Sequence, residues 1–426
     1  MAWLLPPITT VMRLITLFCT TTAVLLLNSG IVAAQNTKTE LPAKADAPES
    51  PPADNDADDD ADDAQGKKAS PIDKVRTYVE KKGWVERFSG DSDGFYPRFG
   101  GMTTGSGFAP GVGYRRHFGD DVLLDLSGGL SKKLYKVVDA RARWVLALDD
   151  RLELWTNFRY QDFPQEDFFG LGHTSSEAAR SNYALTSTDF VGRGLFHLTP
   201  WLDVGMDLGY FQPTISSGTD NTFPSTEHLF SSAQAPGLDA QPDYLHTTWF
   251  ADADNRDRRG SPTRGGRYFI SFARWDDQTL QRFDFNRFDA EASQFFRLIP
   301  KHVFGVHGGI SYVNNDNGHQ VPFYFLPYVG GSDTLRGFEE FRFRDENILY
   351  LNGEYRWQVL KLLDIAAFLD AGEVRPDWQD IDLGDLRTSY GIGFRVHNSK
   401  ATFLRVDIAT GGGEGTRLFF KLRPSF

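Results

Sequence analysis

The chain has 426 residues, a formal net charge of −12 at pH 7, 40% hydrophobic residues and 24% charged residues. The acidic balance argues against a nucleic-acid-binding protein. After the N-terminal segment, no apolar run approaches the roughly 20 residues that a membrane-spanning helix needs. Such averages are typical of a soluble acidic protein, but an aromatic content of 14% also fits a β-barrel with aromatic residues at both membrane interfaces.

Residues 1–34 have the features of a secretory signal peptide. Arg13 precedes an apolar stretch from Leu14 to Leu27, and the small residues Val32-Ala33-Ala34 predict cleavage before Gln35. A retained membrane anchor is the alternative, but the stretch is short and interrupted by threonine. Because the only cysteine, Cys19, lies in this segment, we expect no disulfide or cysteine-based metal site in the mature chain.

Residues 35–70 predict an acidic disordered linker. Their hydrophobicity is low and aspartates crowd positions 54–63, so self-repulsion and chain entropy oppose folding. Binding of cations or of a basic partner is the alternative reading of this run. Residues 71–94 predict a short periplasmic helix and linker, with Pro71 in the first helical turn and Gly83 as the C-cap.

From residue 95 onward, apolar and polar residues alternate with the period of a β-strand. In residues 348–357 one face comprises Leu349, Leu351, Gly353, Tyr355 and Trp357, and the other comprises Asn352, Glu354 and Arg356. Residues 151–163, 388–397 and 402–409 alternate in the same way. A soluble sandwich would give the same alternation, so this pattern alone does not separate a sandwich from a barrel.

The lengths of the connections favour a barrel. We predict sixteen strands, at 95–103, 107–118, 121–132, 134–149, 151–163, 181–198, 201–213, 243–256, 263–276, 282–297, 301–313, 348–358, 363–374, 387–397, 401–410 and 415–426. The four longest connections all follow odd-numbered strands, at 164–180, 214–242, 314–347 and 375–386. A barrel with both termini in the periplasm needs long loops on one side and short turns on the other. The sequence therefore predicts an all-β protein, a 16-stranded antiparallel transmembrane β-barrel over residues 95–426.

The last predicted strand ends on an aromatic residue. Leu418, Phe420, Leu422 and Phe426 share one face. A terminal strand of this kind resembles the signal that the barrel-assembly machinery recognises in its substrates. We therefore expect the outer membrane of a Gram-negative bacterium, with the N-terminal tether in the periplasm and with outer-membrane lipids and the assembly machinery as partners.

Four motifs carry a family resemblance. They are Tyr328-Val329-Gly330-Gly331-Ser332-Asp333-Thr334-Leu335-Arg336-Gly337-Phe338 after Val321-Pro322-Phe323-Tyr324, Phe368-Leu369-Asp370-Ala371-Gly372, Asn255-Arg256-Asp257 with Pro262-Thr263-Arg264-Gly265, and Phe168-Phe169-Gly170-Leu171-Gly172. Together they resemble the BamA/TamA superfamily of bacterial surface antigens, over roughly residues 95–426. Leu335 is a departure, because members usually have valine before the Arg-Gly pair.

The resemblance implies a structural lock between a loop and the barrel. In the family this extracellular loop folds into the lumen, so Arg336 is expected to pair with Glu354 and Asp370 on the barrel wall. Gly330, Gly331 and Gly337 would give the loop positive-φ freedom and let it pass close to the wall. The alternative is that Arg336 is an ordinary solvated loop residue.

The function that the resemblance implies is insertion or translocation of proteins or lipids at the outer membrane, with client proteins as partners. One departure counts against carrying it over: no POTRA domain fits between Gln35 and Gly94. The alternatives are a passive channel or structural barrel constricted by residues 314–347, and an outer-membrane hydrolase. The sequence has no nucleophile elbow, P-loop or dinucleotide motif, and its nine histidines are scattered. We therefore predict no enzyme activity, no catalytic residue, no cofactor and no metal site.

Overall fold

The structure is a computed structural model that describes residues 93–99, 102–103, 105–146, 151–316, 318–397 and 402–421, with side chains omitted at 402 and 403. The predicted signal peptide (1–34), acidic linker (35–70) and short helix near 71–83 lie outside these residues, and so does Phe426.

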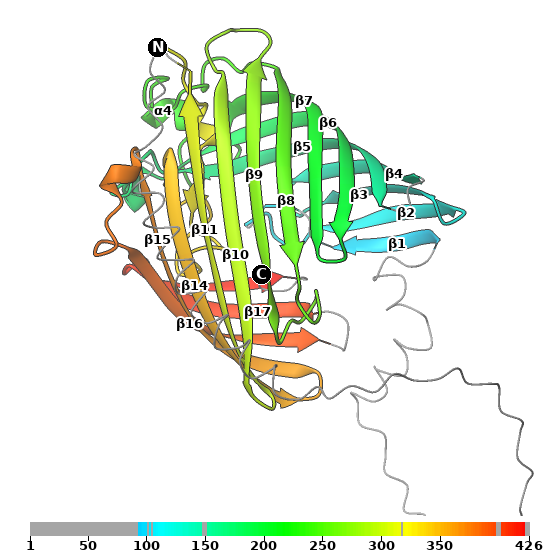
Figure 1. Ribbon diagram of the computed structural model, residues 1–426. Coiled ribbons are helices and arrows are strands. Elements are labelled where there is room, and N and C mark those ends of the chain that lie inside the picture. The colour runs from blue at the N-terminus through cyan, green and yellow to red at the C-terminus, as the bar shows by residue number, and fades with distance from the viewer. Residues whose placement is uncertain are drawn as a thin grey trace, which may run out of the picture. The chain divides into compact units, whose positions relative to one another are not determined.

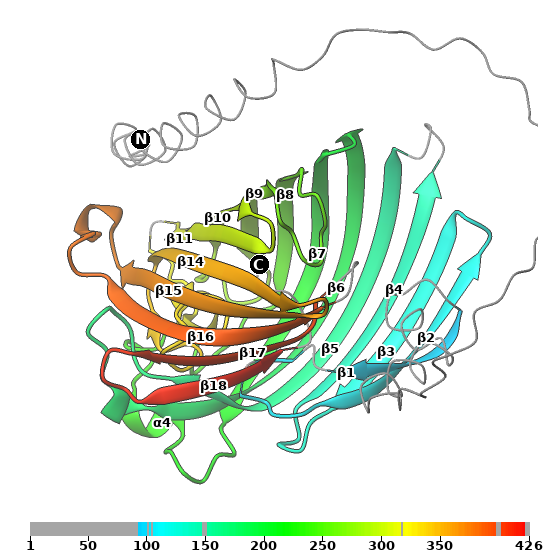
Figure 2. The same ribbon diagram turned by 90° about the horizontal axis from the view of Figure 1, so that it is seen from below.

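Sixteen antiparallel strands follow one another in a single sheet that curves into a barrel (Figures 1 and 2). They are β1 (Gly94–Phe99), β2 (Pro110–Phe118), β3 (Val122–Leu130), β4 (Lys136–Leu146), β5 (Leu152–Phe168), β6 (Ser181–Thr199), β7 (Leu202–Ser217), β8 (Tyr244–Asp254), β9 (Gly265–Asp277), β10 (Phe285–Ile299), β11 (His302–Asn315), β14 (Asn347–Leu360), β15 (Leu363–Arg375), β16 (Arg387–His397), β17 (Thr402–Gly411) and β18 (Thr416–Lys421).

The remaining elements lie in the long loops. A two-stranded sheet pairs β12 (Tyr328–Val329) with β13 (Phe343–Arg344). The short helices are η1 (Glu177–Ala179), α4 (Thr226–Leu229), η2 (Phe323–Phe325) and η3 (Trp378–Asp380). Within the described ranges, every helix is too short or too polar to cross a membrane.

All sixteen predicted strands are confirmed, with different ends. β5 runs to Phe168 and β7 to Ser217, each beyond its predicted end and into the long connection that follows it. The hairpin of β12 and β13 was not predicted, since two residues per strand are too few to show a period.

The two faces of the sheet are inverted relative to a soluble protein. Leu351, Trp357 and Ile392 point outward and are exposed, whereas Glu354 and Asp407 point inward and are buried. Apolar residues facing outward and charged residues facing inward are the arrangement of a transmembrane barrel. The barrel prediction is therefore confirmed over the sandwich.

The four longest connections lie at one end of the barrel. They span residues 169–180, 218–243, 316–346 and 376–386, and each follows an odd-numbered strand of the barrel, as predicted. The order of hydrogen-bonded strands begins at β1 and ends at β18, and no pairing joins the described residues of these two strands. The barrel therefore has one identifiable seam.

Candidate functional site

The loop between β11 and β14, here called the inward loop (residues 318–346), is packed inside the barrel. Its apolar side chains form a buried cluster with residues of the barrel wall, comprising Val329, Leu335, Phe338, Phe343, Ile348, Tyr350 and Val374. A solvated extracellular loop would leave these side chains in water. The inward-folded loop is thus part of the fold.

Glycines shape this loop in two different ways. Gly330 and Gly331 adopt φ of +125° and +79°, a region that favours glycine. Gly337 does not have a positive φ, so that part of the expectation was wrong. A Cβ on Gly337 would lie 2.6 Å from the Gly411 backbone nitrogen and 2.6 Å from the Ser389 Cβ. Gly337 is required for close approach to the wall, not for backbone conformation.

Arg336 lies between the two carboxylates that the resemblance assigned to it. Its Nη1 donates to Glu354 Oε2 at 3.0 Å, and its Nη2 donates to Asp370 Oδ1 at 2.5 Å. Its Nε and its backbone N–H also donate to Asp370, at 3.0 and 3.1 Å. The side chains are almost completely buried, with exposed fractions of 2%, 1% and 0% for Arg336, Glu354 and Asp370. Arg336 is therefore not a solvated loop residue.

Two further arginines and one carboxylate extend this site. Arg395 donates to Glu354 Oε2 at 2.7 Å and to Asp407 Oδ1 at 2.5 Å. Arg405 Nε donates to Asp407 Oδ2 at 2.5 Å, and its Nη2 donates to the Ser332 carbonyl at 2.8 Å. We call Arg336, Arg395, Arg405, Glu354, Asp370 and Asp407 the lumen charge network. Its three guanidinium groups and three carboxylates balance one another.

Strand register explains why these residues meet. Asn352 pairs with Asp370 across β14 and β15, Asp370 with Ser389 on β16, and Ser389 with Gly411 on β17. Asn352 Nδ2 and Ser389 Oγ both donate to Asp370, at 2.9 and 3.0 Å. This row of small or polar residues leaves the space into which Arg336 and Gly337 fit.

An aromatic ring completes the surroundings of Arg336. The guanidinium carbon lies 3.4 Å from the centre of the Phe368 ring, a cation–π contact. Burial alone would lower the pKa of Arg336, but Asp370, with Glu354 and Asp407, outweighs burial and raises the pKa above its ordinary value. The Arg336 guanidinium is therefore held in its charged form.

The inward loop also contacts the last strand and a second extracellular loop. Asp333 accepts from Lys421 of β18 at 2.7 Å, and Glu339 pairs with Arg417 of the same strand. Glu339 also pairs with Arg180 at 3.3 Å. These contacts attach the loop both to β18 and to the connection between β5 and β6.

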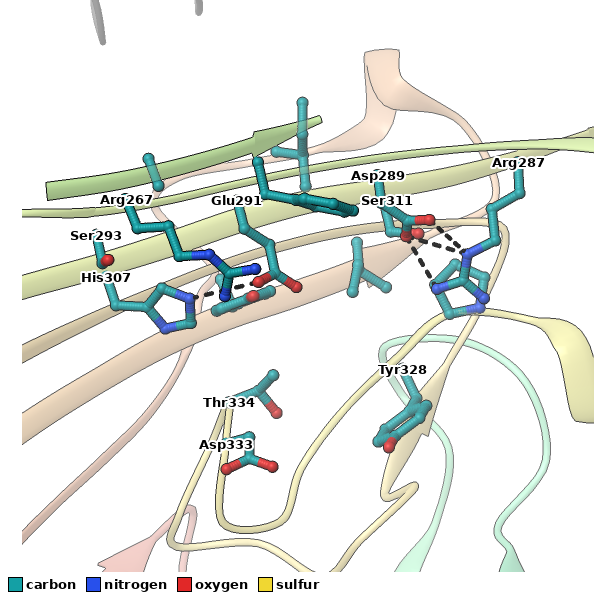
Figure 3. Close-up of a pocket in the computed structure, with 16 residues that line it drawn as sticks. Arg267, Arg287, Asp289, Glu291, Ser293, His307, Ser311, Tyr328, Asp333 and Thr334 are labelled. Carbon is teal, nitrogen blue, oxygen red and sulfur yellow. Dashed lines mark hydrogen bonds and ion pairs between the residues drawn. The ribbon is translucent and has the colours of Figure 1, made fainter. Parts of the chain in front are cut away.

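Two compartments remain beside the loop. The first, of about 450 Å³, separates Asp333, Thr334 and Tyr328 of the loop from the wall of β9 to β11 (Figure 3). Charged residues of the wall line it, namely Arg267, Arg287, Asp289 and Glu291. The second, of about 360 Å³, lies on the side of Lys421 and Arg159. The loop divides the lumen but leaves space for water molecules on both sides.

An antiparallel barrel of sixteen strands with an apolar outside, a charged inside and an inward extracellular loop is an outer-membrane β-barrel protein. The model of the Omp85 superfamily domain matches residues 143–420. The chain belongs to the Omp85 superfamily, which confirms the resemblance seen in the sequence.

Solved structures agree with this assignment. A crystal structure of BamA from Haemophilus ducreyi lacking POTRA domains 1–3 is 17% identical, with a TM-score of 0.57 and coverage of 77% of this chain and 69% of that one. CdiB from Escherichia coli is 10% identical, with a TM-score of 0.51 and coverage of 76% of this chain and 61% of that one. At these identities the likeness concerns the fold. Curated proteins gave no match.

Proposed function

We propose that this protein assists the insertion or translocation of polypeptides or lipids at the outer membrane, and that the seam between β1 and β18 is where it acts. The observation that carries this proposal is the lack of hydrogen-bonded pairing between the first and last strands of the sheet. Their described residues do not pair with each other.

An unpaired strand edge is a template for another strand. Its free N–H and C=O groups pair with an incoming extended segment by β-augmentation. Within a bilayer such groups cannot remain unpaired at low cost, so a weak seam favours exchange with a client strand. The lumen charge network would act as a structural lock that keeps β14 to β17 rigid while the seam opens.

Covalent closure of the seam tests this proposal. Phe95, near the start of β1, and Phe420, near the end of β18, are both exposed, so we would introduce Phe95→Cys with Phe420→Cys in a Cys19→Ala background. A matched control pair is Tyr114→Cys with Leu126→Cys, which are cross-strand partners on β2 and β3. The assay is the rate at which a urea-unfolded client barrel folds into liposomes that contain the protein.

Oxidation of the seam pair should reduce the client folding rate to that of empty liposomes, and reductant should restore it. The control pair should leave the rate unchanged in both states. Full acceleration by the cross-linked seam variant, or no acceleration by the wild type, would refute the proposal.

A passive channel is the second candidate, favoured by the compartments on both sides of the inward loop. Planar-bilayer conductance separates the two. A steady open pore in the wild type that widens in Arg336→Ala supports the channel. A closed wild type that accelerates client insertion supports the first proposal.

A further inference from the structure

Three side chains from separate extracellular segments converge outside the lumen charge network. His173 belongs to the connection between β5 and β6, Glu373 to the end of β15, and Asp385 to the connection between β15 and β16. One ligand atom from each of the three lies within 4.8 Å of the others. Imidazole nitrogen and carboxylate oxygen are both ligands for divalent transition metals.

His173 is buried without the hydrogen bonds that a buried histidine normally makes. Its side chain is 3% exposed, and neither ring nitrogen has a hydrogen-bond partner among the described residues. Its Nε2 lies 3.4 Å from Asp385 Oδ2, within ion-pair distance but without hydrogen-bond geometry. Leaving a buried polar group unpaired costs about 1–3 kcal/mol. The imidazole points at carboxylate oxygen without bonding to it.

The surrounding backbone and side chains hold His173 and Glu373 in place. The Gly172 N–H donates to the Arg344 carbonyl at 2.9 Å, and Arg387 donates to the His173 carbonyl at 3.0 Å. The Asp382 N–H donates to Glu373 Oε2 at 3.0 Å. Partners of this kind orient ligands and are a regular part of metal sites.

Arg375 is the main competitor for the carboxylates. It pairs with Glu373 and donates to Asp385 Oδ2 at 2.9 Å. A second guanidinium, that of Arg387, also lies beside His173, so these two cations balance Glu373 and Asp385. Asp345, which is also buried, lies next to Gly172 and adds a further negative charge nearby. The electrostatic balance therefore leaves room for a cation.

We propose that His173, Glu373 and Asp385 form a binding site for a divalent transition metal of the Zn²⁺ type, with water completing the coordination. Two ligands about 2.1 Å from a tetrahedral zinc ion lie about 3.4 Å apart, which matches the distance between His173 Nε2 and Asp385 Oδ2. Glu373 offers a carboxylate oxygen within 4.8 Å of both ligand atoms. Asp385, whose side chain is 62% exposed, provides the path by which the ion enters.

The bound metal would clip two extracellular connections to each other. Gly172 is bonded to Arg344 of the inward loop, so the clip would also hold the outer end of that loop. The site is independent of the seam and of the proposed function.

The test is calorimetric titration of the purified full chain, stripped with a chelator, with ZnCl₂ alone. The variants are His173→Ala and Asp385→Asn, and the matched control is His228→Ala, an exposed histidine on another extracellular loop. We expect one saturable site per chain, at least about tenfold weaker binding in both cluster variants, and unchanged binding in His228→Ala. CaCl₂ should not bind, because calcium prefers an all-oxygen ligand set.

A second readout is limited proteolysis by chymotrypsin after Trp378 and Leu383, which lie in the connection between β15 and β16. Zn²⁺ should slow this cleavage in the wild type and in His228→Ala, but not in Asp385→Asn, whose exposed position keeps the variant folded. Absence of a saturable site in the wild type, or Zn²⁺ binding that survives in both cluster variants, would overturn the proposal.

Discussion

Replacing Arg336 by alanine should release the inward loop and destabilise the barrel. The change removes one of three guanidinium groups from a buried network that also holds three carboxylates. Glu354 would keep Arg395 as its partner at 2.7 Å. Asp370 would keep only the neutral donors Asn352 and Ser389. One buried carboxylate is thereby left without a cation.

The expected loss is about 3–5 kcal/mol, the usual effect of removing one partner from a buried ion pair. Loss of the contact with the Phe368 ring acts in the same direction. The matched control is Arg259→Ala, because Arg259 is 80% exposed and its ion pair with Asp254 is open to solvent. An exposed pair contributes less than about 1 kcal/mol.

Urea unfolding of the refolded barrel in lipid vesicles, followed by tryptophan fluorescence, measures the free energy of unfolding. Proteolysis of residues 318–346 by chymotrypsin reports the position of the loop. A second variant, Arg336→Ala with Asp370→Asn, should lose about 1–3 kcal/mol less than the sum of the two single changes, since it leaves no unpaired carboxylate. If Arg336→Ala stayed within 1 kcal/mol (about the exposed-pair limit) of the wild type and its loop resisted chymotrypsin equally well, the charge network would not hold the loop.

The other predictions concern the loop glycine and the short turn between β8 and β9. Gly337→Ala should cost about 1–3 kcal/mol and increase chymotrypsin cleavage of the inward loop, because the new Cβ meets the backbone of β17, whereas Gly192→Ala meets only one atom at 3.9 Å and should have little effect. Burial alone would raise the pKa of Asp257, but hydrogen bonds from the Thr263 hydroxyl and N–H and from the Arg264 N–H lower it below its ordinary value. Asp257 therefore stabilises the turn above its unfolded pKa of about 3.9, and this stability is lost as the pH falls through the lower folded value. After correction for the intrinsic pH dependence of amide exchange, the protection of the Thr263 N–H should fall in that acid range. Asp257→Asn should abolish this fall, whereas Asp239→Asn, on an exposed extracellular pair, should not.

The sequence was enough to predict the strands, because period-two alternation and connection length are local properties. Glu354 and Asp407 could both be assigned to the face opposite the aliphatic residues before the structure was known. Their membership in one network could not, since alternation gives the face of a residue but not its height along the barrel axis. Asp370 entered the prediction through the family motif and not through its own strand pattern.

His173 illustrates a second limit of prediction from the sequence alone. Its ligand partners, Glu373 and Asp385, lie 200 or more residues further along the chain, and no fixed spacing links a histidine to carboxylates on other loops. The histidines were therefore interpreted as scattered. Only the folded loops bring the three groups together, so a cluster of this kind has no local signal in the sequence.

The height of a residue along the barrel axis depends on the register between neighbouring strands. That register depends in turn on where the turns end each strand. On β16 and β17, Gly393 pairs with Asp407 and Arg395 pairs with Arg405. Two arginines directly opposite each other would repel. Here Asp407 accepts hydrogen bonds from both guanidinium groups and so links them. A shift of β17 by one residue would turn the side chains of both Asp407 and Arg405 out toward lipid and leave Arg395 in the lumen without this anion. The lumen charge network thus also selects one register for the last strands of the barrel, next to the seam.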